Sequence, residues 1–345
     1  NIFTPLYTWQ DETGAQPGPD GKSTAARLTA RTGYPLASGY GLVTLACHQA
    51  AGTIPNGAAA VCTIADYLAM RLSGRSAPCL TPSMAASLGL FDGTGFDREA
   101  VRRAGLPERL LPEVSEEAEL GGGRLRVFAA LGDNQASFLG AGQGRLDAPL
   151  INIGTGSQFS FFTKEHRTVP GLETRPFPGG WLLTGAPLCG GRSFALLERF
   201  FRQTAELVTG TPCPSAYPAM LRALEAPMPD DVPQFRTTFA GTRQDPAERA
   251  VLSGLDEENF APVPLLHALL RGMADELSAC YRAALKAGCA PAGRLLGSGN
   301  GLRRNPALQR AVERSFGLPL TLAAVPEEAA CGAALFTRMQ HEAAL

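Results

Sequence analysis

The sequence predicts an α/β protein, because segments of strand composition alternate with segments of helical composition along most of its length. The chain has 345 residues, of which 45% are hydrophobic and 18% are charged. That composition is typical of a globular protein, and the length suggests two domains. The stretch "GQGRLDAP" at 142–149 breaks the pattern of elements. We therefore predict one domain over residues 1–145 and a second over 146–345.

The first predicted domain contains two helices and one buried strand before its boundary. Residues 58–73 have the composition of a helix, which Gly74 would end. Asp97 is a typical cap for a second, short helix that would end at Gly105. The apolar run 125–132 has the length of a buried strand, and a segment of helical composition follows it directly. Asp133 is therefore expected where a strand ends and a helix begins.

The second predicted domain opens with a hairpin over 149–162. Ile151 and Ile153 alternate before the turn Gly154-Thr155-Gly156, and aromatic residues alternate after it. The remaining elements follow from apolar periodicity, from Asn305 as a helix cap and from glycine stops. They are helices over 192–210, about 264–287, 305–317 and from Pro326, and strands within 294–301 and 318–325.

Composition argues against several classes of protein. The formal net charge is −1 and no basic run interleaves with aromatic residues, so a nucleic-acid partner is not expected. No apolar stretch approaches the ~18 residues of a membrane span. The eight cysteines and four histidines form no metal-ligand pattern, so we predict no protein metal site. Scattered cysteines also predict a reduced, cytoplasmic protein.

Gly21-Lys22-Ser23 matches the end of the phosphate-binding P-loop. That motif needs a glycine five residues before Gly21, where this chain has Gln16, and it needs a buried strand in front. The preceding residues are polar and rich in turn formers, so we interpret this segment as an exposed loop.

Three strand ends carry residues suited to phosphate or sugar chemistry. Asp133, at a helix N-terminus, can accept the proton of an attacking hydroxyl, although it can also simply cap its helix. Gly154-Thr155-Gly156 lets backbone amides approach a phosphate, although such a turn also occurs without a ligand. The glycine turn 297–301 can accept a nucleoside closely or serve only as a connector.

The order of these segments resembles the FGGY family of carbohydrate kinases, and within it the sedoheptulokinase-like branch. The resemblance covers nearly the whole chain and implies the two-domain actin/hexokinase-type ATPase fold, which is ribonuclease H-like. The segments that carry it are "TWQD" (8–11), "TIADYLAMRLSGRSAPCLTPSMAASLGLFD" (63–92), "GDNQAS" (132–137), "NIGTGS" (152–157), "AGTRQDPAERA" (240–250), "GSGNGLRRNPALQRAV" (297–312) and "EEAACGAAL" (327–335).

The resemblance implies a role for each matching residue. Asp133 would be the general base that takes the proton from a sugar hydroxyl. The sugar pocket would be lined by Trp9, Asp11 and Asn134. The ATP phosphates would contact Gly154, Thr155 and Gly156, and the nucleoside would be bordered by Gly241, Gly297, Ser298, Gly299 and Asn305. The cofactors implied are ATP and Mg²⁺, which together with a base suffice for phosphoryl transfer.

Departures from the family pattern leave the substrate open. Family members begin with a glycine- and threonine-rich hairpin, whereas this sequence starts just before Trp9-Gln10-Asp11. The family often has an arginine shortly after Trp-Gln-Asp, whereas Glu12-Thr13-Gly14 follow in this chain. An Asp and an Asn that are frequent in the sedoheptulokinase-like branch are Pro82 and Met84 here. We expect an ATP-dependent kinase of a ketose or polyol, with sedoheptulose as the first choice. Two alternatives stay open: a kinase of xylulose, ribulose or glycerol, and a non-catalytic protein that binds a sugar or a nucleotide as a sensor. A homodimer also stays open.

Overall fold

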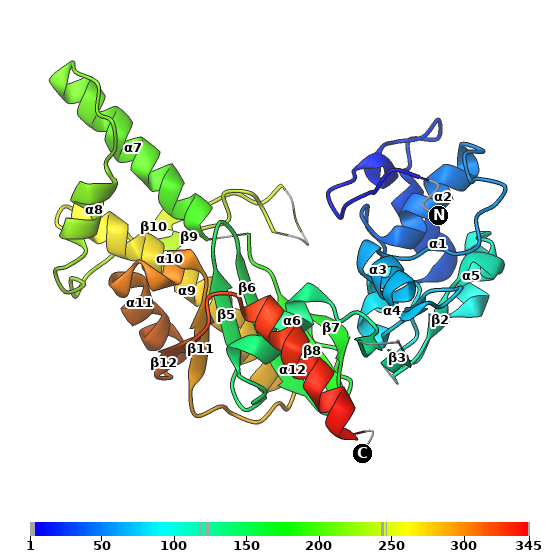
Figure 1. The fold of residues 1–345 in the computed structure, drawn as a ribbon. Coiled ribbons are helices and arrows are strands. Elements are labelled where there is room, and N and C mark those ends of the chain that lie inside the picture. The colour runs from blue at the N-terminus through cyan, green and yellow to red at the C-terminus, as the bar shows by residue number, and fades with distance from the viewer. Residues whose placement is uncertain are drawn as a thin grey trace. The chain divides into compact units, whose positions relative to one another are not determined.

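The structure is a computed structural model that describes residues 4–116, 119–121, 125–188, 190–242, 245 and 247–343. The chain forms two compact units, and most of their elements are labelled in Figure 1. Unit 1 comprises residues 1–136, 176–178 and 333–345, and unit 2 comprises 137–175 and 179–332. The chain first passes from unit 1 to unit 2 inside a helix, ahead of the predicted division after residue 145.

Unit 1 is built mainly from short helices around one apolar core. The largest fully buried side chains of this core include Leu42, Leu80, Leu90 and Leu110. Its helices are α1 (Thr24–Thr32), α2 (Gly41–Ala50), α3 (Ile64–Ser73), α4 (Pro82–Leu88) and α5 (Arg98–Ala104). Its strands form short pairs, β1 (Cys79–Leu80) with β2 (Glu113–Val114) and β3 (Glu119–Gly121) with β4 (Val127–Phe128).

Helix α3 begins later than the sequence predicted. Thr63 and Asp66 form a reciprocal capping box, in which each side chain accepts a hydrogen bond from the other residue's backbone amide. The box fixes the start of the helix at Ile64, so the residues from 58 to 63 stay outside it. The predicted end at Gly74 and the predicted Asp97 cap of α5 are both confirmed.

Unit 2 is organised around one mixed sheet of six strands. Its strand order is β12-β11-β5-β6-β8-β7, with β5 parallel to β11 and antiparallel to β6. The strands are β5 (Leu150–Ile153), β6 (Ser157–Thr163), β7 (Glu173–Phe177), β8 (Gly180–Gly185), β11 (Leu295–Ser298) and β12 (Leu320–Leu322). The predicted hairpin and both predicted late strands are therefore confirmed, the last of them shorter than expected.

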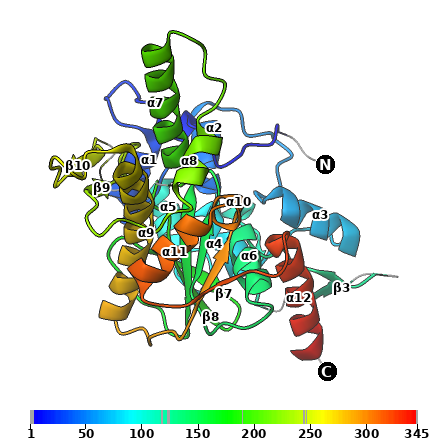
Figure 2. The ribbon, with the colours of Figure 1, turned by 90° about the vertical axis from the view of Figure 1, so that its left-hand side faces the viewer.

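The helices of unit 2 also follow the predicted pattern. The long α9 (Pro262–Lys286) packs against α11 (Pro306–Phe316), as Figures 1 and 2 show, and contributes much of the buried core. Helix α7 (Gly191–Thr209) ends at Gly210 in the left-handed conformation, as expected. The other elements are α8 (Tyr217–Ala223), the hairpin β9 (Gln234–Arg236) with β10 (Val251–Ser253), and α10 (Asn300–Arg303).

A glycine allows two helices to pack closely against each other. Helix α6 (Asp133–Ala141) meets the start of α12 (Glu328–Ala343) at Gly140, where an added side chain would overlap the backbone of Glu328. Its Cβ would also stand 2.8 Å from the amide nitrogen of Gly332. The small residues of "AACGAAL" therefore allow the close packing that their size suggests.

In the part of the chain that the structure describes, no helix has the length and apolar character needed to cross a membrane.

His267, on α9, is a buried ionisable group of unit 2 whose protonation should make stability depend on pH. Its side chain is 5% exposed, and Nε2 has no hydrogen-bond partner within the described structure. Burial lowers the pKa of His267 below its usual 6.5, and the charges of Arg310 and Arg314 on α11 lower it further. The fold therefore holds this imidazole in its neutral form.

We expect the free energy of unfolding to fall as the pH drops below about 6.5, because the unfolded chain then binds a proton that folded His267 excludes. The loss between about pH 7.5 and about pH 5 should be smaller in His267→Met than in the wild type. Urea denaturation at several pH values measures it, with the exposed His166→Gln as the control. An identical pH dependence in His267→Met and the wild type would contradict this account.

Candidate functional site

The turn between β5 and β6 is the centre of the candidate phosphate site in unit 2. Ile153 pairs with Ser157, and Gly154, Thr155 and Gly156 connect the two strands. The amide of Gly154 donates a hydrogen bond of 2.9 Å to the carbonyl of Gly156, which closes the turn. Thr155 and Gly156 are exposed, and a Cβ placed on Gly156 would meet nothing within 4 Å. Space for a ligand group therefore lies beside the turn.

Helix α7 begins beside this turn and determines the direction of its peptide groups (Figure 1). The amide of Gly191 donates to the carbonyl of Gly154 at 2.8 Å, and the amide of Arg192 donates to the carbonyl of Thr155 at 3.1 Å. In a trans peptide the N–H points opposite to the C=O. The amides of Thr155 and Gly156 therefore point away from α7. Two amides and the Thr155 hydroxyl on an exposed turn make a donor set that fits a phosphate.

The end of β11 lies next to the phosphate turn. Ser298 pairs with Asn152 in the parallel ladder, so both strands finish at the same edge of the sheet. Gly299 has a φ of +89°, and a Cβ there would stand 2.5 Å from the carbonyl oxygen of Ile153. Only glycine fits this approach. The structure thus brings the predicted segments 152–156 and 298–299 together.

The other residues predicted to border the nucleoside are buried, and each has a structural role in unit 2. Gly297 is buried within β11, where a Cβ would lie 2.5 Å from Leu302. Asn305 is 7% exposed and accepts the amide of Leu308 at 3.1 Å, which confirms it as the cap of α11. Gly241 is buried in a turn, with its amide 3.0 Å from the carbonyl of Thr238. Their contact with a nucleoside stays a prediction.

Asp133 and Asn134 begin helix α6 and belong to unit 1. Asp133 is exposed, and its Oδ1 accepts the amide of Asn134 at 2.7 Å. The first bond of the helix runs from the amide of Ala136 to the carbonyl of Gly132 at 2.8 Å. Gly132 therefore occupies the capping position, and the Asp133 carboxylate faces solvent. An exposed carboxylate at a helix start is suited to accept a proton.

Trp9 and Asp11, the other predicted sugar residues, lie in the first described segment of unit 1. Trp9 is 79% exposed, and its carbonyl oxygen abuts Gly39. The hydroxyl of Thr13 donates to Asp11 Oδ1 at 2.6 Å, which lowers the pKa of Asp11 and keeps it ionised. Trp9 and Asp11 thus lie beside residues 38–39, whereas Asp133 lies at the start of α6, after β4. A shared sugar pocket for these residues stays a prediction.

The Gly21-Lys22-Ser23 segment has the structure expected of a loop. Ser23 caps α1 by accepting the amide of Ala26 at 3.1 Å. The described residues before it form turns, a short 3-10 helix (Thr13–Ala15) and an isolated bridge from Pro17 to Ser23, but no strand, so the context that a P-loop requires is missing from this described segment. The rejection of the P-loop is confirmed.

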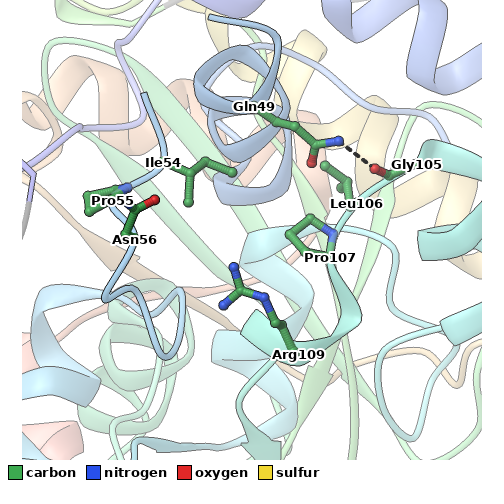
Figure 3. A pocket seen from close by; sticks show the side chains of 8 residues that line it. All are labelled: Gln49, Ile54, Pro55, Asn56, Gly105, Leu106, Pro107 and Arg109. Atoms are coloured by element: carbon green, nitrogen blue, oxygen red, sulfur yellow. Dashed lines mark hydrogen bonds between the residues drawn. The ribbon is translucent and has the colours of Figure 1, made fainter. Parts of the chain in front are cut away.

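A surface pocket of about 370 Å³ lies in another part of unit 1 (Figure 3). Gln49 and Arg109 project into it from opposite sides, and the Gln49 amide donates to the carbonyl of Gly105 at 2.7 Å. Its remaining lining is mostly apolar, from residues 54–55 and 106–107. None of the predicted sugar or nucleotide residues lines this pocket.

Sequence reasoning missed several residues that support the candidate site. Gly190 directly precedes α7 and Gly191 begins it, and a Cβ on Gly190 would stand 2.6 Å from the carbonyl carbon of Gly156. The double glycine before a predicted helix was a visible signal for this close approach. Thr81 and Ser83 contact the loop that leads into Asp133, and no local pattern indicates that contact.

Comparison with known proteins decides the family. Residues 150–341 match the model of the C-terminal domain of the FGGY family of carbohydrate kinases. The chain belongs to that family. The predicted family and the predicted class of enzyme, a phosphotransferase with a hydroxyl acceptor, are therefore confirmed.

Relatives of the family cover both units of the chain. Sedoheptulokinase of Mus musculus is 28% identical over 96% of this chain and 72% of its own length. A ligand-bound xylulose kinase from Lactobacillus acidophilus has a TM-score of 0.74 at 18% identity, over 92% of this chain and 66% of its own. A gluconate kinase from the same organism has a TM-score of 0.78 at 18% identity, over 97% and 70%. These structures confirm the predicted fold class.

Proposed function

We propose that the protein transfers a phosphoryl group from ATP to a hydroxyl of a ketose, and that the ketose is sedoheptulose. The observation that carries this choice of sugar is the 28% identity to a sedoheptulokinase over 96% of the chain. The structural relatives support only the fold, because their identities are 18%. The chain spans 72% of the mouse relative and 66% of the xylulose kinase.

Asp133 serves as the general base in this proposal. Its exposed carboxylate, at the first residue of α6, accepts the proton of the sugar hydroxyl as that oxygen attacks phosphorus. Asp11 and Asn134 hold sugar hydroxyls through their polar side chains, and Trp9 offers an apolar face to the carbon chain. The ionised state of Asp11 supports its part as an acceptor of sugar hydroxyls.

The exposed turn of unit 2 holds the phosphates of ATP. The outward amides of Thr155 and Gly156, together with the Thr155 hydroxyl, donate to phosphate oxygens. Gly154 gives the turn its shape, and Gly241, Gly297, Ser298, Gly299 and Asn305 border the nucleoside. Bound ATP supplies the phosphoryl group, and Mg²⁺ offsets its charge. The described cysteines are all free thiols, which supports a reducing, cytoplasmic setting. A homodimer stays open.

The test is ADP release by the product of the complete gene, with ATP and Mg²⁺, across a panel of sugars. The panel contains sedoheptulose, xylulose, ribulose, glycerol and gluconate. We expect sedoheptulose to stimulate ADP release well above the sugar-free rate, with the highest kcat/KM of the panel. A coupled spectrophotometric assay measures the rate, and mass spectrometry identifies the phosphorylated product.

Other outcomes separate the alternatives. A higher kcat/KM for another sugar keeps the kinase and replaces its substrate. No stimulation by any sugar, with ATP still bound in calorimetry, would contradict the kinase proposal and favour a nucleotide-binding sensor.

A further inference from the structure

Thr81 occupies the capping position of α4 but does not cap that helix. A threonine at this position usually accepts a backbone amide of the first helical turn. Here its side chain makes no capping bond. Its hydroxyl instead donates to the carbonyl of Ala130 at 2.6 Å, across 49 residues of sequence. The side chain is directed to the loop that leads into Asp133, at the expense of its own helix.

Ser83 completes a directed chain of hydrogen bonds with Thr81. The two hydroxyl oxygens are 2.9 Å apart, and the amide of Gly132 donates to Ser83 Oγ at 3.3 Å. Each hydroxyl has a single proton to donate. Because Thr81 donates its proton to Ala130, Ser83 must donate to Thr81 and accept from Gly132. The chain thus begins at an amide of the loop and ends at a carbonyl of the same loop.

This arrangement holds the loop as a neighbouring strand would hold it. The carbonyl of Ala130 and the amide of Gly132 are two residues apart, the spacing at which a β-strand presents such groups on one edge. Thr81 and Ser83 are 5% and 7% exposed, so water does not readily replace these bonds.

Gln135 is a buried residue that lies close to this loop. This side chain is 4% exposed, and its amide donates to the carbonyl of Pro176 at 3.1 Å. A Cβ on Gly132 would stand 2.5 Å from the carboxamide oxygen of Gln135. Gly132, the residue directly before Asp133, therefore bonds to Ser83 and lies against Gln135.

We propose that Thr81 and Ser83 are positioning residues that fix the Asp133 carboxylate for proton transfer. The proposal rests on the proposed function, because Asp133 is the base only in a sugar kinase. Neither hydroxyl touches the reacting atoms in this account. They act through Ala130 and Gly132, which set the position of the first residue of α6.

The test compares Thr81→Val with Thr81→Ser in the complete protein. Valine keeps the shape and removes the hydroxyl, and we expect kcat to fall about 10-fold or more while KM for sugar and ATP stays within about threefold. Serine keeps the hydroxyl and should restore most of kcat. In an Asp133→Asn background, Thr81→Val should cause no further loss, because the positioned group is gone.

Thr32→Val is the matched control. Thr32 is 6% exposed, and its hydroxyl donates to the carbonyl of Leu28 at 2.8 Å, within α1. It should lower stability about as much as Thr81→Val and leave kcat unchanged. An equal loss of kcat in both variants, or a further loss in the Asp133→Asn background, would overturn the proposal.

Hydrogen exchange separates this proposal from the proposed function. If no sugar is phosphorylated by the wild type, exchange of the amides at 130–134 still reports on the loop. Faster exchange there in Thr81→Val, and not in Thr32→Val, would retain the structural half of the proposal and reject only the sugar kinase. Unchanged exchange with normal sugar phosphorylation would overturn the positioning role alone.

Discussion

Asp133→Asn is expected to lower kcat for sugar phosphorylation by roughly 10²–10⁴-fold, which is the usual contribution of a positioned general base. Asparagine has nearly the same shape as aspartate, and its oxygen can still accept the hydrogen bond from the amide of Asn134. It cannot take the proton of the attacking hydroxyl. Asp133 is exposed, so the substitution should leave the fold unchanged. The measurement is steady-state ADP release with the sugar selected by the panel, together with thermal unfolding.

Comparing KM with kcat helps to identify the role of Asp133. If the carboxylate acts as a base, KM for the sugar should change by only about threefold while kcat falls, because the lost interaction belongs to the transition state. Asp20→Asn is the control, because this exposed carboxylate of unit 1 pairs with Arg27 at 2.7 Å outside the candidate site. It should keep wild-type rates. Near-normal turnover by Asp133→Asn would remove Asp133 from the mechanism.

The sequence alone predicted the hairpin of β5 and β6, the strands β11 and β12 and the helices α7, α9 and α11 of unit 2, but not β7, β8, the hairpin of β9 and β10, α8 or α10. The predicted elements carry local signals that act within a few residues, such as the alternation around Ile151 and Ile153 and the Asn305 cap. The stop of α7 at Gly210 is of the same kind, because only the local backbone decides it. The start of α6 at Asp133 was predicted for the same reason.

Unit 1 and the support of the site were harder to predict because their determinants are distant in sequence. The run 125–132 has strand composition, yet β4 covers only Val127–Phe128. The residues after it bond to the hydroxyls of Thr81 and Ser83 in place of a longer strand partner. Thr81 also resembles an ordinary helix cap in sequence. Nothing local indicates that its hydroxyl serves Ala130.

Gly190 shows the same limit in unit 2. The residue lies between β8 and α7, and the double glycine in its sequence context indicates a close backbone approach but not which segment is approached. In the fold, its Cα approaches the phosphate turn so closely that a Cβ would stand 2.6 Å from the carbonyl carbon of Gly156 and 2.7 Å from its oxygen. These are backbone atoms, so no side-chain rotation can relieve the overlap. Its φ of +154° with a ψ of −158° is also a conformation reserved for glycine.

Gly190→Ala is therefore expected to separate the start of α7 from the phosphate turn. The bonds from Gly191 to Gly154 and from Arg192 to Thr155 would lengthen, and the amides of Thr155 and Gly156 would lose their outward direction. We expect the dissociation constant for ATP to rise about 10- to 100-fold, as for a donor set displaced by about 1 Å. Calorimetry with a non-hydrolysable ATP analogue and Mg²⁺ measures this change.

Two further variants keep the result interpretable if Gly190→Ala also lowers stability. Gly210→Ala places alanine at a positive φ of +69° at the other end of α7, with nothing within 4 Å, and should cost about 1 kcal/mol of stability without weakening ATP binding. Gly156→Ala adds a methyl group where no neighbour lies within 4 Å, so the fold should tolerate it. If the turn holds the phosphates, that methyl group should still weaken ATP binding. Full ATP affinity in both Gly190→Ala and Gly156→Ala would mean that the phosphates bind elsewhere, because one variant displaces the turn and the other obstructs it.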